Sequence, residues 1–161
     1  MKFSFAIIII AFPLLVWPAC NSELVTTPEE AIQENKDEND EDMKDTLTIT
    51  IGDKVFTATL EANATAAAFK AILPLTIDMR DLNGNEKFFD LSNNLPTNAS
   101  NPRTINAGDI MLWSYNTLVL FYKTFNTSYS YTRIGKIENP NGLSQALGSG
   151  NVTVTFELLS K

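Results

Sequence analysis

The chain has 161 residues, of which 19 are acidic, 12 are basic, one is cysteine and none is histidine. This composition excludes a Ser-His-Asp triad, a Cys-His nucleophile pair, the usual zinc ligand sets and an intramolecular disulfide, and we expect no metal or other cofactor. Ten of the acidic residues fall within residues 21–45, which leaves residues 46–161 with equal numbers of acidic and basic residues. Without a basic excess to neutralise phosphates, the chain is not expected to bind nucleic acid.

Residues 1–19 have the layout of a secretory signal peptide. Lys2 precedes an apolar run over residues 5–17, and the small residue Ala19 comes just before Cys20. A helix that spans a bilayer needs about 20 apolar residues, and this run is shorter and is interrupted by Pro13. We therefore expect a cleaved signal peptide rather than a permanent membrane span.

Cys20 is a candidate for lipid attachment. The segment Val-Trp-Pro-Ala-Cys at residues 16–20 resembles the lipobox of bacterial lipoproteins, although Trp17 stands where that motif usually has leucine. The acidic segment at residues 20–45 is self-repelling and poor in apolar side chains, which predicts an extended, disordered tether. The resemblance implies a lipid that holds the protein on a membrane of the bacterial cell envelope, at the periplasmic face or on the outer-membrane surface. The alternative is an ordinary cysteine near the end of the signal.

Strand patterns dominate residues 46–161, which form the predicted globular domain. Apolar residues alternate with threonine over residues 46–51 and 55–60, and the Gly52-Asp53 pair between them predicts a hairpin. The Asn83-Gly84 pair predicts a second hairpin. The remaining strands are expected at residues 75–79, 87–91, 109–115, 117–122, 128–137 and 151–158, with a long loop at residues 92–106.

One of these strands is apolar on both faces. Residues 118–122 read Leu-Val-Leu-Phe-Tyr, so neither face of the strand is polar. This pattern predicts a strand that lies beneath a helix or crosses the centre of a barrel.

Two short helices interrupt the strands. Residues 63–73 are rich in alanine, with Asn63 or Thr65 as N-cap and Pro74 at the end, and a predicted apolar face formed by Phe69, Ile72 and Leu73. Residues 143–147 predict a second helix, closed by a left-handed C-cap at Gly148. About eight strands and two helices in so short a segment predict a mainly β fold, a closed eight-stranded barrel that leaves no exposed edge.

Candidate ligand-binding side chains lie toward the C-terminal half of the domain. If residues 128–137 form one strand, Tyr129, Tyr131 and Arg133 share a face. Such a face is either a platform for a carboxylate or a peptide, or an outer barrel surface covered by aromatic pairs. Trp113 and Tyr122 are further candidates as pocket aromatics, with core packing as the alternative, and a last candidate lies in the long loop, Asn98.

Short blocks in a fixed order carry a resemblance to a known family. They are Thr57-Ala-Thr-Leu-Glu-Ala-Asn63, Leu73-Pro-Leu-Thr76, Asp81-Leu-Asn83, Leu95-Pro-Thr-Asn98, Ala107-Gly-Asp109, Leu118-Val-Leu-Phe-Tyr122 and Tyr131-Thr-Arg-Ile-Gly135. Together they resemble a small family of bacterial cyclophilin-like domains over essentially all of residues 46–161. The resemblance implies an eight-stranded barrel capped by two helices, in agreement with the strand and helix patterns.

The resemblance does not imply prolyl isomerase activity. True cyclophilins carry a Phe-His-Arg strand after the first helix and a Gly-Ser-Gln-Phe-Phe segment, whereas this chain has Thr76-Ile-Asp-Met-Arg80 at the first place and no counterpart of the second. We therefore expect a non-catalytic, envelope-anchored binding module for a peptide segment or a small metabolite. The alternatives are a structural partner in the envelope and a divergent peptidyl-prolyl isomerase, in which Arg80 or Arg133 would stabilise the twisted amide.

Overall fold

The structure, a computed structural model, describes residues 45–159. The predicted signal peptide, Cys20 and all of the predicted tether except Asp45 lie outside the described residues. Within the described part of the chain, neither helix is long and apolar enough to cross a membrane.

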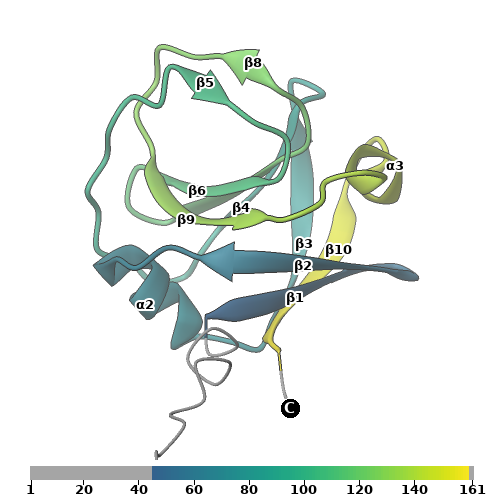
Figure 1. The fold of residues 1–161 in the computed structure, drawn as a ribbon, viewed down its shortest axis with the longest axis horizontal. Coiled ribbons are helices and arrows are strands. Elements are labelled where there is room, and N and C mark those ends of the chain that lie inside the picture. Colours follow the sequence, from purple (N-terminus) through teal and green to yellow (C-terminus); the bar gives the residue numbers. More distant parts are fainter. Residues whose placement is uncertain (1–44, 160–161) are drawn as a thin grey trace, which may run out of the picture. The chain divides into compact units, whose positions relative to one another are not determined.

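Eight antiparallel strands close into a barrel, in the order β1-β10-β3-β4-β7-β6-β9-β2 (Figure 1). In chain order these strands are β1 (Thr46–Ile51), β2 (Lys54–Leu60), β3 (Leu75–Leu82), β4 (Glu86–Asp90), β6 (Asp109–Trp113), β7 (Thr117–Phe121), β9 (Thr132–Ile137) and β10 (Val152–Leu158). The other elements are the helices α2 (Ala64–Lys70) and α3 (Leu143–Leu147) and a two-stranded sheet formed by β5 (Thr104–Ile105) and β8 (Phe125–Asn126). The prediction of a closed eight-stranded barrel with two short helices is confirmed.

Both predicted hairpin turns are present. Gly52 joins β1 to β2 with a φ of 58°, and Asn83 and Gly84 join β3 to β4 with φ values of 56° and 65°. Two successive positive φ values are typical of the tight turns that match the twist of paired strands, and asparagine and glycine adopt them at low cost. Strand β1 then buries alternate residues, and Leu47, Ile49 and Ile51 enter the core.

Helix α2 begins where the sequence predicts and ends earlier. The side chain of Asn63 accepts a hydrogen bond from the backbone N–H of Ala66 at 2.8 Å and is the N-cap. The helix stops at Lys70, so the predicted apolar face is wrong for Ile72, which lies beyond the helix and is exposed. Phe69 is fully buried and packs edge-on against Phe156, with 5.7 Å between ring centroids.

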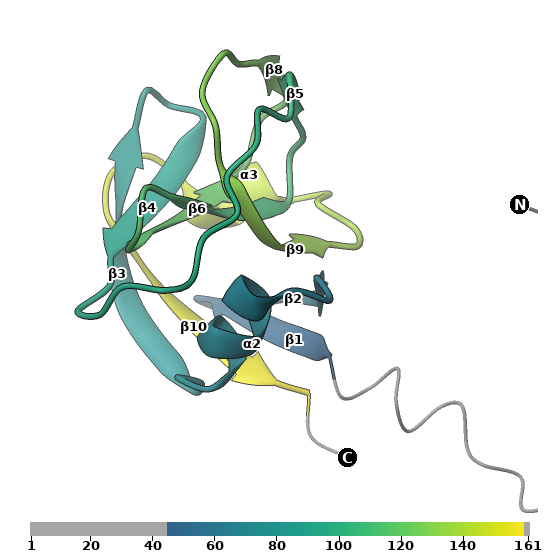
Figure 2. The same cartoon turned by 90° about the vertical axis from the view of Figure 1, so that its left-hand side faces the viewer.

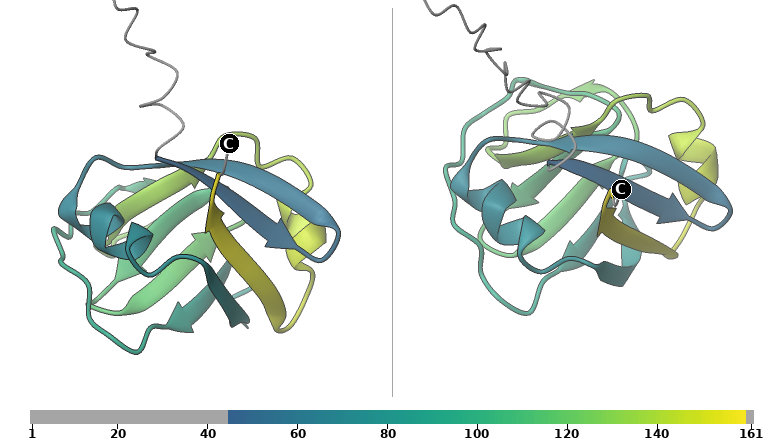
Figure 3. Two further views of the ribbon diagram at one scale, coloured as in Figure 1. Left: turned by 90° about the horizontal axis from the view of Figure 1, so that it is seen from below. Right: turned by 60° about the horizontal axis from the view of Figure 1, so that its bottom comes forward.

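Helix α3 spans the predicted residues, on the opposite side of the barrel from α2 (Figure 3). Its buried residues are Leu143 and Leu147. Gly148 has the positive φ expected of a C-cap, at 56°, but its ψ of −166° is extended, so the predicted left-handed cap is wrong. Its backbone N–H still donates to the carbonyl oxygen of Ser144 at 3.1 Å, which closes the last turn.

The strand predicted at residues 128–137 and the loop predicted at residues 92–106 are both corrected. Strand β9 starts only at Thr132, and β5 forms near the end of the loop. The cause is the pairing of β5 with β8, which draws the segment before β9 away from the barrel. Figures 1 and 2 show the β5–β8 pair beyond β6, on the side away from β1 and β2.

Strand β7 is buried along its whole length, as the apolar pattern predicts, but the cover differs from the prediction. Leu118 and Leu120 face the barrel core, while Val119 and Phe121 face outward into a second apolar cluster with Ile105 and Tyr131. The β5–β8 segment therefore covers the outer face of β7, and β7 neither lies beneath a helix nor crosses the barrel.

Candidate functional site

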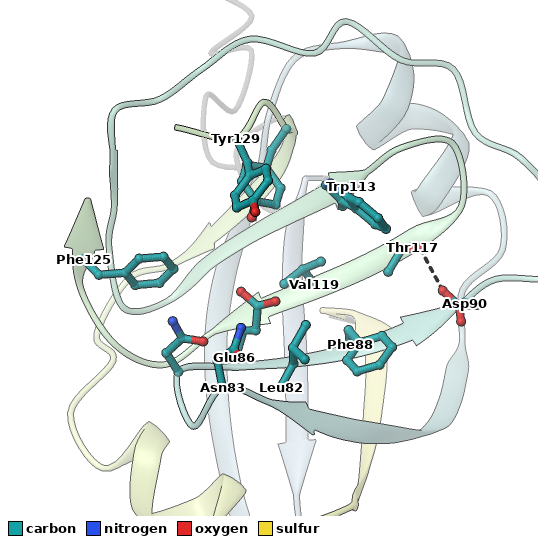
Figure 4. A pocket seen from close by; sticks show the side chains of 12 residues that line it. Leu82, Asn83, Glu86, Phe88, Asp90, Trp113, Thr117, Val119, Phe125 and Tyr129 are labelled. Carbon is teal, nitrogen blue, oxygen red and sulfur yellow. Dashed lines mark hydrogen bonds between the residues drawn. The ribbon is translucent and has the colours of Figure 1, made fainter. Parts of the chain in front are cut away.

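The outer face of β3, β4, β7 and β6 carries a cavity of about 400 Å³, the outer-face pocket (Figure 4). Its lining residues alternate along each strand, as side chains on one face of a sheet do. Register brings Glu86 opposite Phe121, Phe88 opposite Val119 and Asp90 opposite Thr117. The pocket therefore lies on the side of these strands that faces away from the barrel core.

Five aromatic rings surround the pocket: Phe88, Trp113, Phe125, Tyr129 and Tyr131. Trp113 and Tyr129 are 49% and 66% exposed, so they form a rim that a ligand can reach. Tyr131 and Phe125 are held in place by Phe121, with ring centroids 5.4 and 5.8 Å away. Burial raises the pKa of Tyr131, and the nearby charge of Glu86 raises it further.

Glu86 brings a carboxyl group into this aromatic environment. Glu86 is only 8% exposed, and its side chain has no hydrogen-bond partner and no ion pair among residues 45–159. Burial, with a smaller contribution from the negative charge of Asp81, raises the pKa of Glu86 to about 7. Figure 4 shows the carboxyl group directed from β4 into the space between Phe125 and Val119.

The neighbouring Lys87 cannot neutralise Glu86, because strand alternation turns Lys87 into the barrel. Its ammonium group is fully buried and donates to Asp81 Oδ2 at 2.7 Å and to the carbonyl oxygens of Gly148 and Gly150 at 2.9 and 2.6 Å. Tyr122 also donates to Asp81 Oδ2, at 2.7 Å. These two donors lower the pKa of Asp81, and burial raises the pKa of Tyr122 to about 12.

The second carboxylate of the pocket, Asp90, is fully engaged. Arg80 Nη2 donates to Asp90 Oδ2 at 2.8 Å, and Thr117 Oγ1 donates to Asp90 Oδ1 at 2.7 Å. The guanidinium of Arg80 also stacks over the ring of Phe88, 4.4 Å from its centroid. Arg80 is thus held at the edge of the pocket.

The structure brings together three of the ligand-binding candidates of the sequence, Trp113, Tyr129 and Tyr131. The shared strand face with Arg133 is wrong, because residues 128–131 lie before β9. Arg133 is exposed, with Nη1 4.0 Å from Asp109 Oδ1, and does not line the pocket. Tyr122 lies inside the barrel, and Asn98 lies in a loop where its backbone N–H donates to Thr132 Oγ1 at 3.0 Å.

The two arginines considered for an isomerase stand far apart. Arg80 of β3 pairs with Phe88 of β4, and Arg133 of β9 pairs with Met111 of β6. Strand β7 lies between β4 and β6, and its Val119 pairs with both Phe88 and Met111. Four strand spacings separate the arginines, about 19 Å along the sheet. One substrate amide cannot contact both.

Sequence reasoning missed Glu86, Phe88, Asp90 and Phe125. Residues 88 and 89 are both phenylalanine, so the sequence of β4 does not show which face is internal. Phe125 belongs to a strand of two residues, which has no recognisable periodicity. Within residues 45–159 no group of three acidic, histidine or cysteine side chains is arranged to hold a metal.

The sequence matches a protein-family model described as the Cyclophilin-like family over residues 49–157. The chain belongs to this cyclophilin-like family. No sequence among the curated proteins matches it. Among solved structures, this cyclophilin-like chain is similar to the solution structure of a hypothetical protein from Archaeoglobus fulgidus, at 17% identity and a TM-score of 0.49, over 73% of this chain and 96% of the other.

Proposed function

We propose that this cyclophilin-like protein is a non-catalytic binding module, and that the outer-face pocket takes a small metabolite or a peptide segment. The observation that carries the proposal is the combination of five aromatic rings with the buried, unpartnered carboxyl of Glu86. A buried polar group without a partner costs free energy. Such a cost is commonly retained where a ligand supplies the missing partner.

A matched pair of tyrosine variants tests the proposal. Tyr129 lines the pocket and is 66% exposed, while Tyr115 is 61% exposed and lies outside it. A thermal-shift screen of the full-length protein against small metabolites and short peptides is expected to yield ligands that Tyr129→Ala weakens at least tenfold and Tyr115→Ala leaves unchanged. Ligands equally sensitive to both variants, or to neither, would place binding elsewhere.

The alternative function is a divergent peptidyl-prolyl isomerase, favoured by the contact of Arg80 with the pocket ring Phe88. Under this alternative, full-length protein at micromolar concentration accelerates isomerisation of a proline peptide, and Arg80→Ala or Arg133→Ala reduces the rate. Under the binding proposal, the wild-type protein and both variants give the uncatalysed rate.

We also propose that the module is anchored to the bacterial cell envelope through a lipid on Cys20. The support is the sequence of residues 1–45, in which an apolar signal, a lipobox-like segment and an acidic tether follow one another. These residues precede β1, so the tether would separate the membrane from the binding domain.

A further inference from the structure

The lining of the outer-face pocket carries negative charge without a matching positive charge. Its side chains include the carboxylates Glu86 and Asp90, and no lysine or arginine is among them. Asp90 is balanced by Arg80 and Thr117, as described above. Glu86 is left unbalanced, so once it is ionised the pocket repels an anionic ligand and attracts a cationic one.

The basic side chains of the pocket strands β3 and β4 are committed elsewhere. Lys87 is fully buried on the opposite face of β4, where its ammonium group donates to Asp81 and to two backbone carbonyl groups. Arg80 is bound to Asp90 and stacked on Phe88. Neither can turn toward Glu86 without giving up these interactions, so neither supplies a counter-charge to the ionised form of Glu86.

Two acceptors in the pocket wall also have no hydrogen-bond donor among residues 45–159. The carboxyl of Glu86 has no donor among residues 45–159, and the buried Oδ1 of its neighbour Asn85 has no partner there either. Buried acceptors in folded proteins are nearly always satisfied. The unsatisfied Oδ1 of Asn85, beside a Glu86 carboxyl that opens to the pocket without a donor, therefore favours a ligand that donates hydrogen bonds, as an ammonium group does.

The aromatic rings suit the same ligand. The faces of aromatic rings attract cations within about 6 Å, and Phe88 already binds the guanidinium of Arg80 at 4.4 Å from its centroid. The rim rings of Trp113 and Tyr129 offer apolar surface to an alkyl chain. Carboxylate and aromatic rings together favour a cationic head on an apolar stem.

We propose that the outer-face pocket binds a primary alkylammonium group, with the carboxylate of Glu86 as its counter-ion and the rings of Trp113 and Tyr129 against its alkyl chain. This inference rests on the proposed binding function and names its ligand class. The same group occurs in free alkylamines and in lysine side chains, and the experiment separates these two sources.

Three ligands of similar size and different charge test the inference: n-butylammonium, 1-butanol and butyrate. Binding to the full-length protein is followed by the NMR signal of the Trp113 indole N–H, assigned with Trp113→Phe. We expect a saturable shift with butylammonium, at least tenfold weaker binding of butanol, and none of butyrate. Cadaverine and a lysine residue capped at both ends then show whether a free amine or a peptide side chain binds more tightly.

Glu86→Gln keeps the size of the side chain and removes its charge. It is expected to weaken butylammonium binding at least tenfold and to abolish the preference for butylammonium over butanol, whereas the control Glu157→Gln, on the exposed side of β10, changes neither. Unchanged butylammonium affinity in Glu86→Gln overturns the inference. So does equal or tighter binding of butanol or butyrate by the wild-type protein.

The outcomes also separate this inference from the proposed function. If butanol or butyrate binds best and Tyr129→Ala weakens it, the pocket remains a binding site and only the ligand class is wrong. If none of these ligands shifts the Trp113 signal and the metabolite and peptide screen also yields nothing, both proposals fail.

Discussion

Glu86 is buried where its ionised form has no partner, so its ionisation should destabilise the fold. Its ordinary pKa is 4.5 and burial raises this to about 7. Below pH 4.5 the group is protonated in both states and contributes nothing. Between these values the folded state holds a proton that the unfolded state has lost, so the free energy of unfolding falls as pH rises. The loss becomes complete about one pH unit above the folded pKa, at up to about 3 kcal/mol.

Glu86→Gln should remove this dependence. Urea unfolding of the variant is expected to match the wild-type protein near pH 4.5 and to show greater stability at pH 8, by up to about 3 kcal/mol. The control Glu157→Gln, at an exposed site, should follow the wild-type curve. Parallel pH curves for Glu86→Gln and the wild-type protein would show that Glu86 ionises freely in the folded state.

At the scale of elements, Lys87 joins β4 to β3 through Asp81 and to the segment between α3 and β10 through the carbonyl groups of Gly148 and Gly150. Breaking a buried ion pair costs about 3–5 kcal/mol, because a charged or polar group remains buried without a partner. We expect Asp81→Asn, which leaves a buried ammonium group without its carboxylate, to lower the free energy of unfolding by an amount in this range, and Lys87→Met to lower it by less, because Asp81 is 23% exposed.

The double variant Lys87→Met/Asp81→Asn should lose less than the sum of the two single losses, since the second change removes a partner that is already missing. Urea unfolding of all four proteins measures the coupling. The exposed pair of Lys54 and Asp53 provides the control, and Lys54→Met should have no measurable effect. Additive losses would mean that the buried pair contributes no coupling.

The sequence predicts the elements that depend on neighbouring residues, but not the pairing between distant segments. Hairpin turns depend on residues adjacent in the chain, so Asn83-Gly84 is sufficient to predict the β3–β4 connection. The pocket depends on pairings between distant segments. Tyr129 and Tyr131 left the predicted strand because β8 pairs with β5, 22 residues earlier in the sequence, as the register of Asn126 with Thr104 shows.

The local sequence of β4 also does not predict which of its side chains point into the barrel. A buried lysine next to a buried glutamate contradicts the usual preference of charged residues for the surface. Lys87 is internal because Asp81 and the carbonyl groups near α3 accept its hydrogen bonds and the Tyr122 ring lies 5.6 Å from its ammonium group, and only the closed barrel brings these partners together. Glu86 is then forced outward, beneath the aromatic rings.

At the scale of the whole molecule, the proposed lipid on Cys20 would fix where the binding domain operates. Acyl chains contribute about 0.8 kcal/mol for each buried CH₂ group, so a lipidated cysteine would hold the chain at a membrane. Bacteria that express the wild-type chain and are fed labelled palmitate are expected to yield a labelled, membrane-associated protein. Cys20→Ala should abolish the label and release the protein into the soluble fraction.

A second variant separates the role of Cys20 from that of the residues that precede it. Trp17→Leu restores the usual lipobox residue and should label at least as strongly as the wild-type chain, because it leaves Cys20 and the apolar run intact. Ligand binding is expected to be the same in the wild-type chain and in Cys20→Ala, since the outer-face pocket is built entirely from residues 82–131. Label that persists in Cys20→Ala would refute the anchor and leave the pocket proposals untouched.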